Sequence, residues 1–122
     1  MLAAWPGGTC PGDYFCAPAV GIYGQITPYT DSTGVSDIGP TIRSLSYIDR
    51  PWLAGHAYTQ FWAIVMLNPG DVVYANGVGH RITGRYIQFG CSAPSQLADL
   101  SLQTSLTPYA CGLDIVVRAA LQ

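Results

Sequence analysis

The sequence predicts a mainly β single domain that closes, or partly closes, into a barrel. Short runs of alternating or β-branched apolar residues are separated by Gly, Pro and Asn-Gly turn signals, a pattern typical of small barrels. A length of 122 residues fits one domain. All basic residues are arginine and all acidic residues are aspartate, so the lysine and glutamate that usually cover helix surfaces are missing. A helical bundle is therefore excluded.

Charge is sparse, which excludes several function classes. Charged residues make up 10% of the chain and the formal net charge is -2, whereas a typical soluble domain carries about 25% charged residues. Five scattered arginines cannot form a basic groove that follows phosphates, so we expect no nucleic-acid binding. No apolar run is long enough to span a membrane. The spacing of Cys, His and Asp fits no metal site, and we expect neither metal nor cofactor.

The N-terminal part divides into an arm and the first barrel strand. Residues 1–18 contain many Pro and Gly and show no periodicity, so we predict an irregular arm, with residues 19–122 forming the barrel domain. Residues 20–26 alternate in the period of a half-buried strand. A loop rich in Thr, Ser, Asp and Gly follows over residues 28–37, and residues 38–47 are ambiguous.

The middle of the chain predicts a strand, a short helix and a hairpin. Residues 51–55 read as a buried strand that ends at glycine. Residues 59–67 carry a one-sided apolar stripe after a possible N-cap at Thr59; the stripe consists of Phe61, Trp62, Ile64, Val65 and Leu67. Strands over residues 71–75 and 81–89 flank an Asn-Gly turn at residues 76–79.

The C-terminal part predicts two more strands, each preceded by a loop. The loops cover residues 91–99 and 107–112. Residues 100–105 alternate, with Leu100 and Leu102 on one face, and residues 115–121 form a nearly continuous β-branched run that is typical of a central strand.

The four cysteines predict two disulfides and an oxidising location. Four cysteines allow three pairings; Cys10 and Cys16 flank a Pro-Gly-Asp turn, so a local bridge between them is plausible, and Cys91 would then pair with Cys111. An even cysteine count in a chain rich in Gly and Pro is typical of extracellular domains. We therefore expect the protein outside the cell, or on the surface of a cell or particle.

The two histidines differ in their surroundings. His80 adjoins the Asn-Gly hairpin, and we predict an exposed turn residue. His56 directly follows a predicted buried strand and precedes the helix. Because the ends of barrel strands commonly carry functional groups, His56 is a candidate catalytic residue.

These segments together resemble the sortase family. The resemblance rests on Leu53-Ala54-Gly55-His56, on Pro69-Gly70-Asp71-Val72-Val73-Tyr74, on Leu100-Ser101-Leu102-Gln103-Thr104-Ser105 and on the last strand, in that order over residues ~50–121. It implies an eight-stranded closed barrel and a cysteine transpeptidase that joins sorting-signal proteins to amines. Such an enzyme needs a thiolate nucleophile, a histidine acid and an arginine that stabilises the oxyanion.

The resemblance places His56 at the histidine position, but two catalytic positions depart from the family. Ser105 stands at the nucleophile position, and a serine without a neighbouring base is a poor nucleophile. Asp114 stands where the arginine should begin the last strand, and a carboxylate there would repel an oxyanion. Arg118 lies four residues further on and matches a second family arginine. Cys111 is an alternative nucleophile, although Pro108 disfavours the strand it would require.

Three functions follow from these departures. The first is a sortase-like extracellular domain without transpeptidase activity that acts as a binding or structural module. The second is a structural subunit of an extracellular assembly, such as a virion decoration or tail protein or a surface filament, that contacts protein partners or further copies through the N-terminal arm and its aromatic residues Trp5, Tyr14 and Phe15. The third is an active cysteine or serine transpeptidase of altered mechanism.

Overall fold

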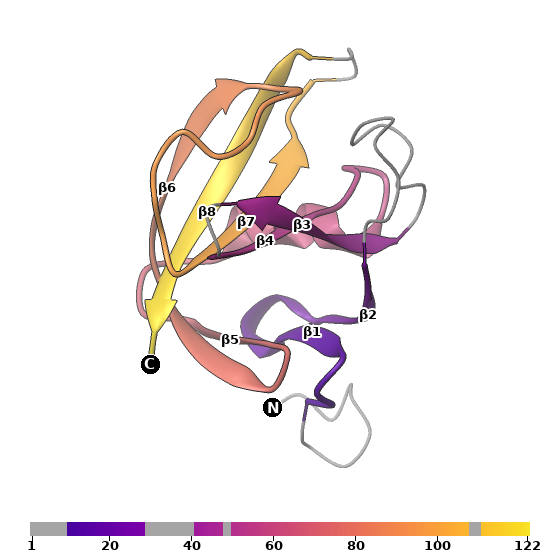
Figure 1. Cartoon of the computed structure of the whole chain (residues 1–122), viewed down its shortest axis with the longest axis vertical. Helices are drawn as coiled ribbons and strands as arrows, with labels where there is room; N and C mark the ends of the chain where they lie inside the picture. The colour runs from indigo at the N-terminus through magenta and orange to yellow at the C-terminus, as the bar shows by residue number, and fades with distance from the viewer. Residues whose placement is uncertain (1–9, 29–40, 48–49, 108–110) are drawn as a thin grey trace.

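A computed structural model describes residues 10–28, 41–47, 50–107 and 111–122. The predicted closed barrel is confirmed. Eight described strands follow one another around it in the order β1-β2-β3-β4-β7-β8-β6-β5, and β5 returns to β1 (Figure 1). They are β1 Tyr14–Ala17, β2 Ile22–Pro28, β3 Ile42–Tyr47, β4 Arg50–Ala54, β5 Val72–Ala75, β6 Val78–Phe89, β7 Leu100–Ser105 and β8 Leu113–Leu121.

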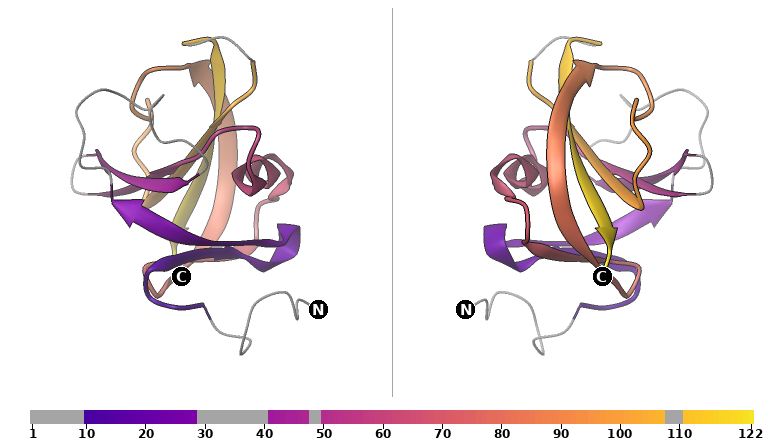
Figure 2. Two further views of the ribbon diagram at one scale, coloured as in Figure 1. Left: turned by 90° about the vertical axis from the view of Figure 1, so that its right-hand side faces the viewer. Right: turned by 90° about the vertical axis from the view of Figure 1, so that its left-hand side faces the viewer.

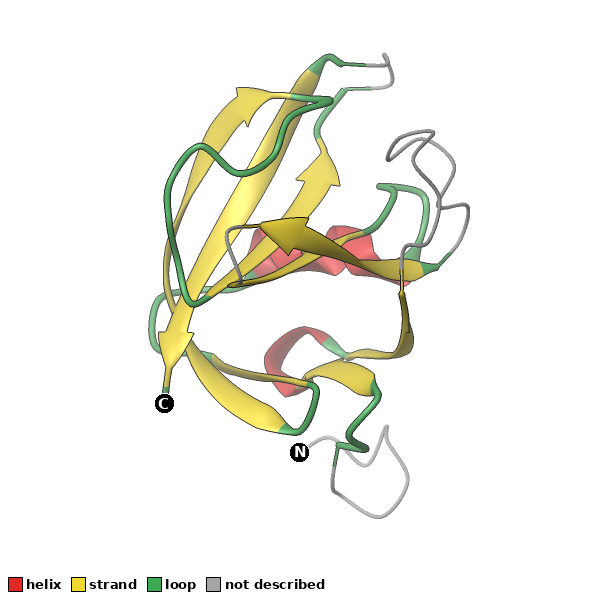
Figure 3. Ribbon diagram, viewed as in Figure 1, coloured by secondary structure: helices red, strands yellow, loops and turns green. Residues whose placement is uncertain are grey.

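Two of the neighbouring strand pairs are parallel. β2 pairs with β3, and β4 pairs with β7, whereas the remaining pairs around the barrel are antiparallel. A parallel pair needs a long crossover, and the crossover between β4 and β7 contains the helix η4 and the hairpin of β5 and β6. Figure 3 shows η4 beside the strands, and both views of Figure 2 place it on the outside of the sheet.

The N-terminal strand β1 corrects the predicted arm. Residues 14–17 are part of the barrel, because β1 pairs with both β2 and β5, and a short 3-10 helix η2, Pro18–Val20, follows it. Phe15 is fully buried in the core, so it is not available to a partner. A four-residue strand has too few positions to show a period, and its partner β5 is far along the chain. The rest of the arm, with Trp5, lies outside the described residues.

The helix η4, Gln60–Met66, is confirmed at its predicted place and is a 3-10 helix. Thr59 caps it, since its side chain accepts a hydrogen bond from the Phe61 N–H at 3.2 Å. In a 3-10 helix, residues three apart lie on one edge, and Phe61, Ile64 and Leu67 are buried at this spacing. The predicted stripe was wrong for Trp62 and Val65, which the 3-10 geometry turns away from the core.

The other elements agree closely with prediction. The turn between β5 and β6 has positive φ at Asn76 (53°) and Gly77 (77°), as an Asn-Gly hairpin requires. The ambiguous residues 42–47 form β3, and the strand predicted from residue 20 begins at Ile22, after η2. The loop predicted over residues 28–37 lies almost wholly outside the described residues, and so do positions 108–110 of the loop 107–112.

Strand β7 is buried on both faces, although its alternation predicts one exposed face. Leu100 and Leu102 point into the core, while Ser101 and Gln103 are also buried. The segment between β6 and β7 accounts for this, because the Gln103 side chain donates to the Ser92 carbonyl at 3.2 Å. The polar face of β7 is therefore covered by this loop, and Ser105 is the next residue on that face after Gln103.

Candidate functional site

Three chain segments meet at one end of β7. The parallel register pairs Ala54 of β4 with Gln103 of β7, and the Gly55 N–H donates to the Gln103 carbonyl at 3.2 Å. The antiparallel register pairs Ser105 of β7 with Asp114 of β8. The sequence therefore places His56, Ser105 and Asp114 together, because each stands at or next to the end of one of three adjacent strands.

A glycine makes the turn from β4 toward the helix possible. A Cβ atom on Gly55 would lie 2.7 Å from the Cβ of Phe61, closer than non-bonded carbon atoms approach. Phe61 is one of the buried residues that dock η4 on the core. The small residue before His56 thus lets the helix pack against the strand end.

The Asp114 carboxylate is the centre of the hydrogen bonds at this site. Its Oδ2 accepts from the Gln103 side-chain amide at 2.7 Å, and Ser105 pairs with Asp114 in register. Burial raises the pKa of Asp114 above its ordinary value, while the bonds from Gln103 and Ser105 and the nearby charge of His56 act in the opposite direction. Gln103 was not predicted as a site residue; the signal available was its place between Ser101 and Ser105 on one polar strand face.

His56 lies in the turn after β4, half-buried. Its ring stacks on Tyr58, with ring centroids 5.2 Å apart and an interplanar angle of 15°. Its carbonyl accepts from the Thr59 hydroxyl at 2.7 Å, which ties the turn to the helix cap. The side chain is thus positioned by both an aromatic contact and a backbone anchor.

A shallow pocket opens beside Ser105. It has a volume of about 240 Å³ and is lined by Ala57, Trp62, Ser105, Leu106 and Thr107. The walls are mainly apolar, and Ser105 and Thr107 contribute two hydroxyl groups. Trp62, which the 3-10 helix turns away from the core, forms part of this wall.

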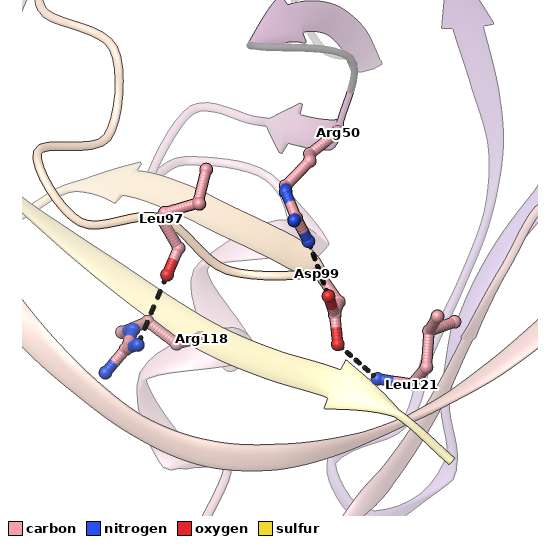
Figure 4. A network of polar contacts seen from close by, with 5 residues as sticks. All are labelled: Arg50, Leu97, Asp99, Arg118 and Leu121. Atoms are coloured by element: carbon pink, nitrogen blue, oxygen red, sulfur yellow. Dashed lines mark hydrogen bonds and ion pairs between the residues drawn. The ribbon is translucent and has the colours of Figure 1, made fainter.

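Arg118 is not brought to Ser105. It pairs in register with Ser101, and it lies about 13 Å along β8 from Asp114 at the usual rise per residue. Its Nη2 donates to the Leu97 carbonyl at 3.3 Å, in the segment between β6 and β7 (Figure 4). Arg118 therefore holds that segment against β8.

Both predicted disulfides are confirmed. Cys10 bonds to Cys16 and Cys91 to Cys111, with Cα–Cα distances of 6.0 and 4.8 Å. All four cysteines of the chain are used, so Cys111 has no thiol that could act as a nucleophile. The second bridge joins the residues just after β6 to those just before β8, next to Ser105 and Asp114.

The prediction of an exposed His80 was wrong. Only 2% of its surface is exposed, because it lies at the start of β6 beside the last residues of β8. The hairpin turn is two residues long, so His80 already belongs to the strand. The sequence around His80 does not indicate that the end of β8 lies beside it.

Comparison with solved structures shows a sortase-like fold. Listeria monocytogenes sortase A superposes with a TM-score of 0.71 at 14% identity, covering 93% of this chain and 88% of that one. Clostridium perfringens sortase C with its C-terminal cell wall sorting motif gives 0.70 at 16% identity, over 89% and 69%. Streptococcus pneumoniae sortase C gives 0.70 at 13%, over 89% and 66%. No family model and no curated protein matches the sequence.

Proposed function

We propose that this sortase-like barrel is an extracellular binding or structural domain that does not catalyse transpeptidation. The observation that carries the proposal is the Asp114 carboxylate, which accepts a hydrogen bond from Gln103 and pairs in register with Ser105 at the strand ends where the reaction would occur. The fold is sortase-like, and Asp114 stands where the resemblance to the family leads one to expect an arginine.

The chemistry of acyl transfer explains why this arrangement favours binding over catalysis. Attack on a carbonyl develops negative charge on its oxygen, and a donor or cation must stabilise that charge. Asp114 would oppose it, and Arg118 is engaged with Leu97 further along β8. The nucleophile would have to be the Ser105 hydroxyl, because each cysteine is in a disulfide.

The pocket beside Ser105 supports a binding role. Its apolar walls suit an apolar side chain of a partner protein, and the hydroxyls of Ser105 and Thr107 suit hydrogen bonds to a polypeptide backbone. The two disulfides favour an oxidising location such as the cell exterior or the surface of a particle. In the described residues no helix combines the length and apolar character needed to cross a membrane.

The test is a cleavage assay with peptides that carry cell wall sorting motifs, in the presence of an amine acceptor. We expect no cleavage or transfer by the wild-type protein above that of Ser105→Ala. Wild-type turnover that Ser105→Ala abolishes would overturn the proposal and support the serine transpeptidase alternative. Binding of the same peptides, followed by NMR shifts of Trp62 and Leu106, measures the pocket separately from catalysis.

A second candidate function, a self-assembling structural subunit, is favoured by exposed apolar residues on β6 and β8. Ile87 and Phe89 are 60% and 75% exposed, and Leu113, which pairs in register with Phe89, is 39% exposed. Neighbouring exposed apolar side chains are a common feature of subunit interfaces. Light scattering after size exclusion should show a concentration-dependent oligomer. Phe89→Ser should reduce the amount of oligomer, whereas Val78→Ser, at an exposed residue near the other end of β6, should leave it unchanged. A monomer at all concentrations would refute assembly through this surface.

A further inference from the structure

A second pocket lies at the opposite end of β8 from Ser105. It has a volume of about 370 Å³, and its polar walls are Arg50, Asn76, His80 and Asp99. Leu121 lies at its edge, about 24 Å along β8 from Asp114 at the usual rise per residue. The two pockets are therefore separate sites.

An ion pair forms one wall of this pocket. Arg50 Nη1 lies 2.6 Å from Asp99 Oδ1, and Asp99 Oδ2 accepts from the Leu121 N–H at 2.9 Å (Figure 4). These hydrogen bonds and the Arg50 charge hold the pKa of Asp99 below its ordinary value, against the effect of burial. The wall thus combines one positive and one negative group with no net charge.

His80 forms a neutral wall beside the ion pair. Burial lowers the pKa of the ring, outweighing its hydrogen bond to Val78 and the charge of Asp99, so the ring is uncharged at neutral pH. Its Nδ1 lies 3.1 Å from the Val78 carbonyl and must carry the proton there. The group that His80 has left to offer is Nε2, a hydrogen-bond acceptor.

The remaining walls are apolar or amphipathic. Pro51, Val78 and Leu121 supply apolar surface, and the exposed Asn76 amide supplies both a donor and an acceptor. Each carboxylate oxygen of Asp99 accepts one bond described above and can accept a second. The pocket therefore combines hydrogen-bond donors and acceptors with apolar surface.

We propose that this pocket binds an uncharged, hydroxyl-rich ligand of the size of a monosaccharide. Each hydroxyl can donate to Asp99 or His80 and accept from Arg50 or Asn76, while the C–H face of the ring packs on Pro51 and Leu121. Since Arg50 and Asp99 carry opposite charges and are paired with each other, the pocket offers no net charge that would attract an anionic or a cationic ligand. This site is independent of the function proposed for the Ser105 pocket.

Backbone amide NMR titration tests the proposal with four sugars of one ring size: glucose, N-acetylglucosamine, glucosamine and glucuronate. We expect at least one neutral sugar to shift the amides of Asn76, His80 and Leu121 with a dissociation constant of about 1–10 mM, a range common for weak sites. The two charged sugars should bind several-fold more weakly. Absence of shifts for both neutral sugars at about 100 mM, or stronger binding of either charged sugar, overturns the proposal.

Substitutions test the location of the site and the effect of the Arg50–Asp99 ion pair on which sugars bind. Asn76→Gly keeps a residue that tolerates positive φ and should weaken neutral-sugar binding at least 3-fold. Arg50→Gln leaves Asp99 without its cation and should make glucosamine the preferred sugar. Arg81→Gln removes the same charge from a residue that follows His80 on β6 but does not line the pocket, and it should change neither property. Equal effects of Arg50→Gln and Arg81→Gln would show that net charge, and not this pocket, governs binding.

Discussion

The disulfide beside the candidate site should contribute more stability than the N-terminal one. Cys91 and Cys111 are separated by 20 positions, and Cys10 and Cys16 by 6. If a bridge acts by restricting the unfolded chain, its contribution grows with loop length, giving about 3.3 kcal/mol for the longer loop and about 2.2 kcal/mol for the shorter at 25 °C. We expect Cys91→Ala/Cys111→Ala to lower the free energy of unfolding by about 1 kcal/mol more than Cys10→Ala/Cys16→Ala.

Urea unfolding without reductant, followed by tryptophan fluorescence and circular dichroism together, measures this difference. Both half-cystines of the longer loop have positive φ, 60° at Cys91 and 57° at Cys111. Glycine adopts this conformation without strain, so Cys91→Gly/Cys111→Gly should be no less stable than the alanine pair. Equal or greater loss on removing the shorter bridge would refute the loop-entropy reasoning, since both bridges are compared in one barrel.

Three further predictions concern the helix cap and the buried titratable groups. Thr59→Ala should lower the free energy of unfolding by about 1 kcal/mol and Thr59→Ser by much less, measured in urea, because the side chain caps η4. The pKa of His80 is lowered by burial, so the unfolded chain binds the proton first as pH falls. The contribution of His80 to the free energy of unfolding should therefore be complete above about pH 6.5, and the free energy should decline below that pH, less so in His80→Gln. A pH-independent difference in stability between the wild type and His80→Gln would contradict this prediction. The pKa of Asp114 is raised by burial, so its contribution is present below about pH 3.8 and lost as pH rises. As pH rises from 3 to 7, the urea midpoint of Asp114→Asn should therefore increase relative to that of the wild type. No relative increase would refute the prediction.

Most of the barrel could be predicted because its strands carry local signals. The Asn76-Gly77 turn and the β-branched run of β8 determine their own conformation. Strand β1 and the burial of His80 could not be predicted, because both depend on pairing with segments far along the chain. Trp62 was misplaced for a different reason: the apolar spacing of η4 does not by itself distinguish a 3-10 helix from an α-helix.

Three members of the candidate site could be named from the sequence, whereas Gln103 and the contacts among the residues could not. The positions of His56, Ser105 and Asp114 follow from the order of the strands. The role of Gln103 depends on the loop that covers β7, since that loop carries the Ser92 carbonyl to which the amide donates. The distance of Arg118 from Ser105 follows from register alone.

Closure of the barrel limits how the protein can contact others. Each of the eight described strands has a neighbour on both sides, and β5 joins β1. The neighbours do not pair along their full length, however: β5 pairs with β6 only over Val78–Arg81, and residues 84–89 of β6 pair with β8 alone. Addition of an extended peptide or a second copy as a further strand is therefore confined to such short unpaired segments. Elsewhere on the barrel a partner has to recognise side chains, and we expect its specificity to be set by the residues of β6 and β8 or of the two pockets. Substitutions on those surfaces should therefore change partners without changing the fold.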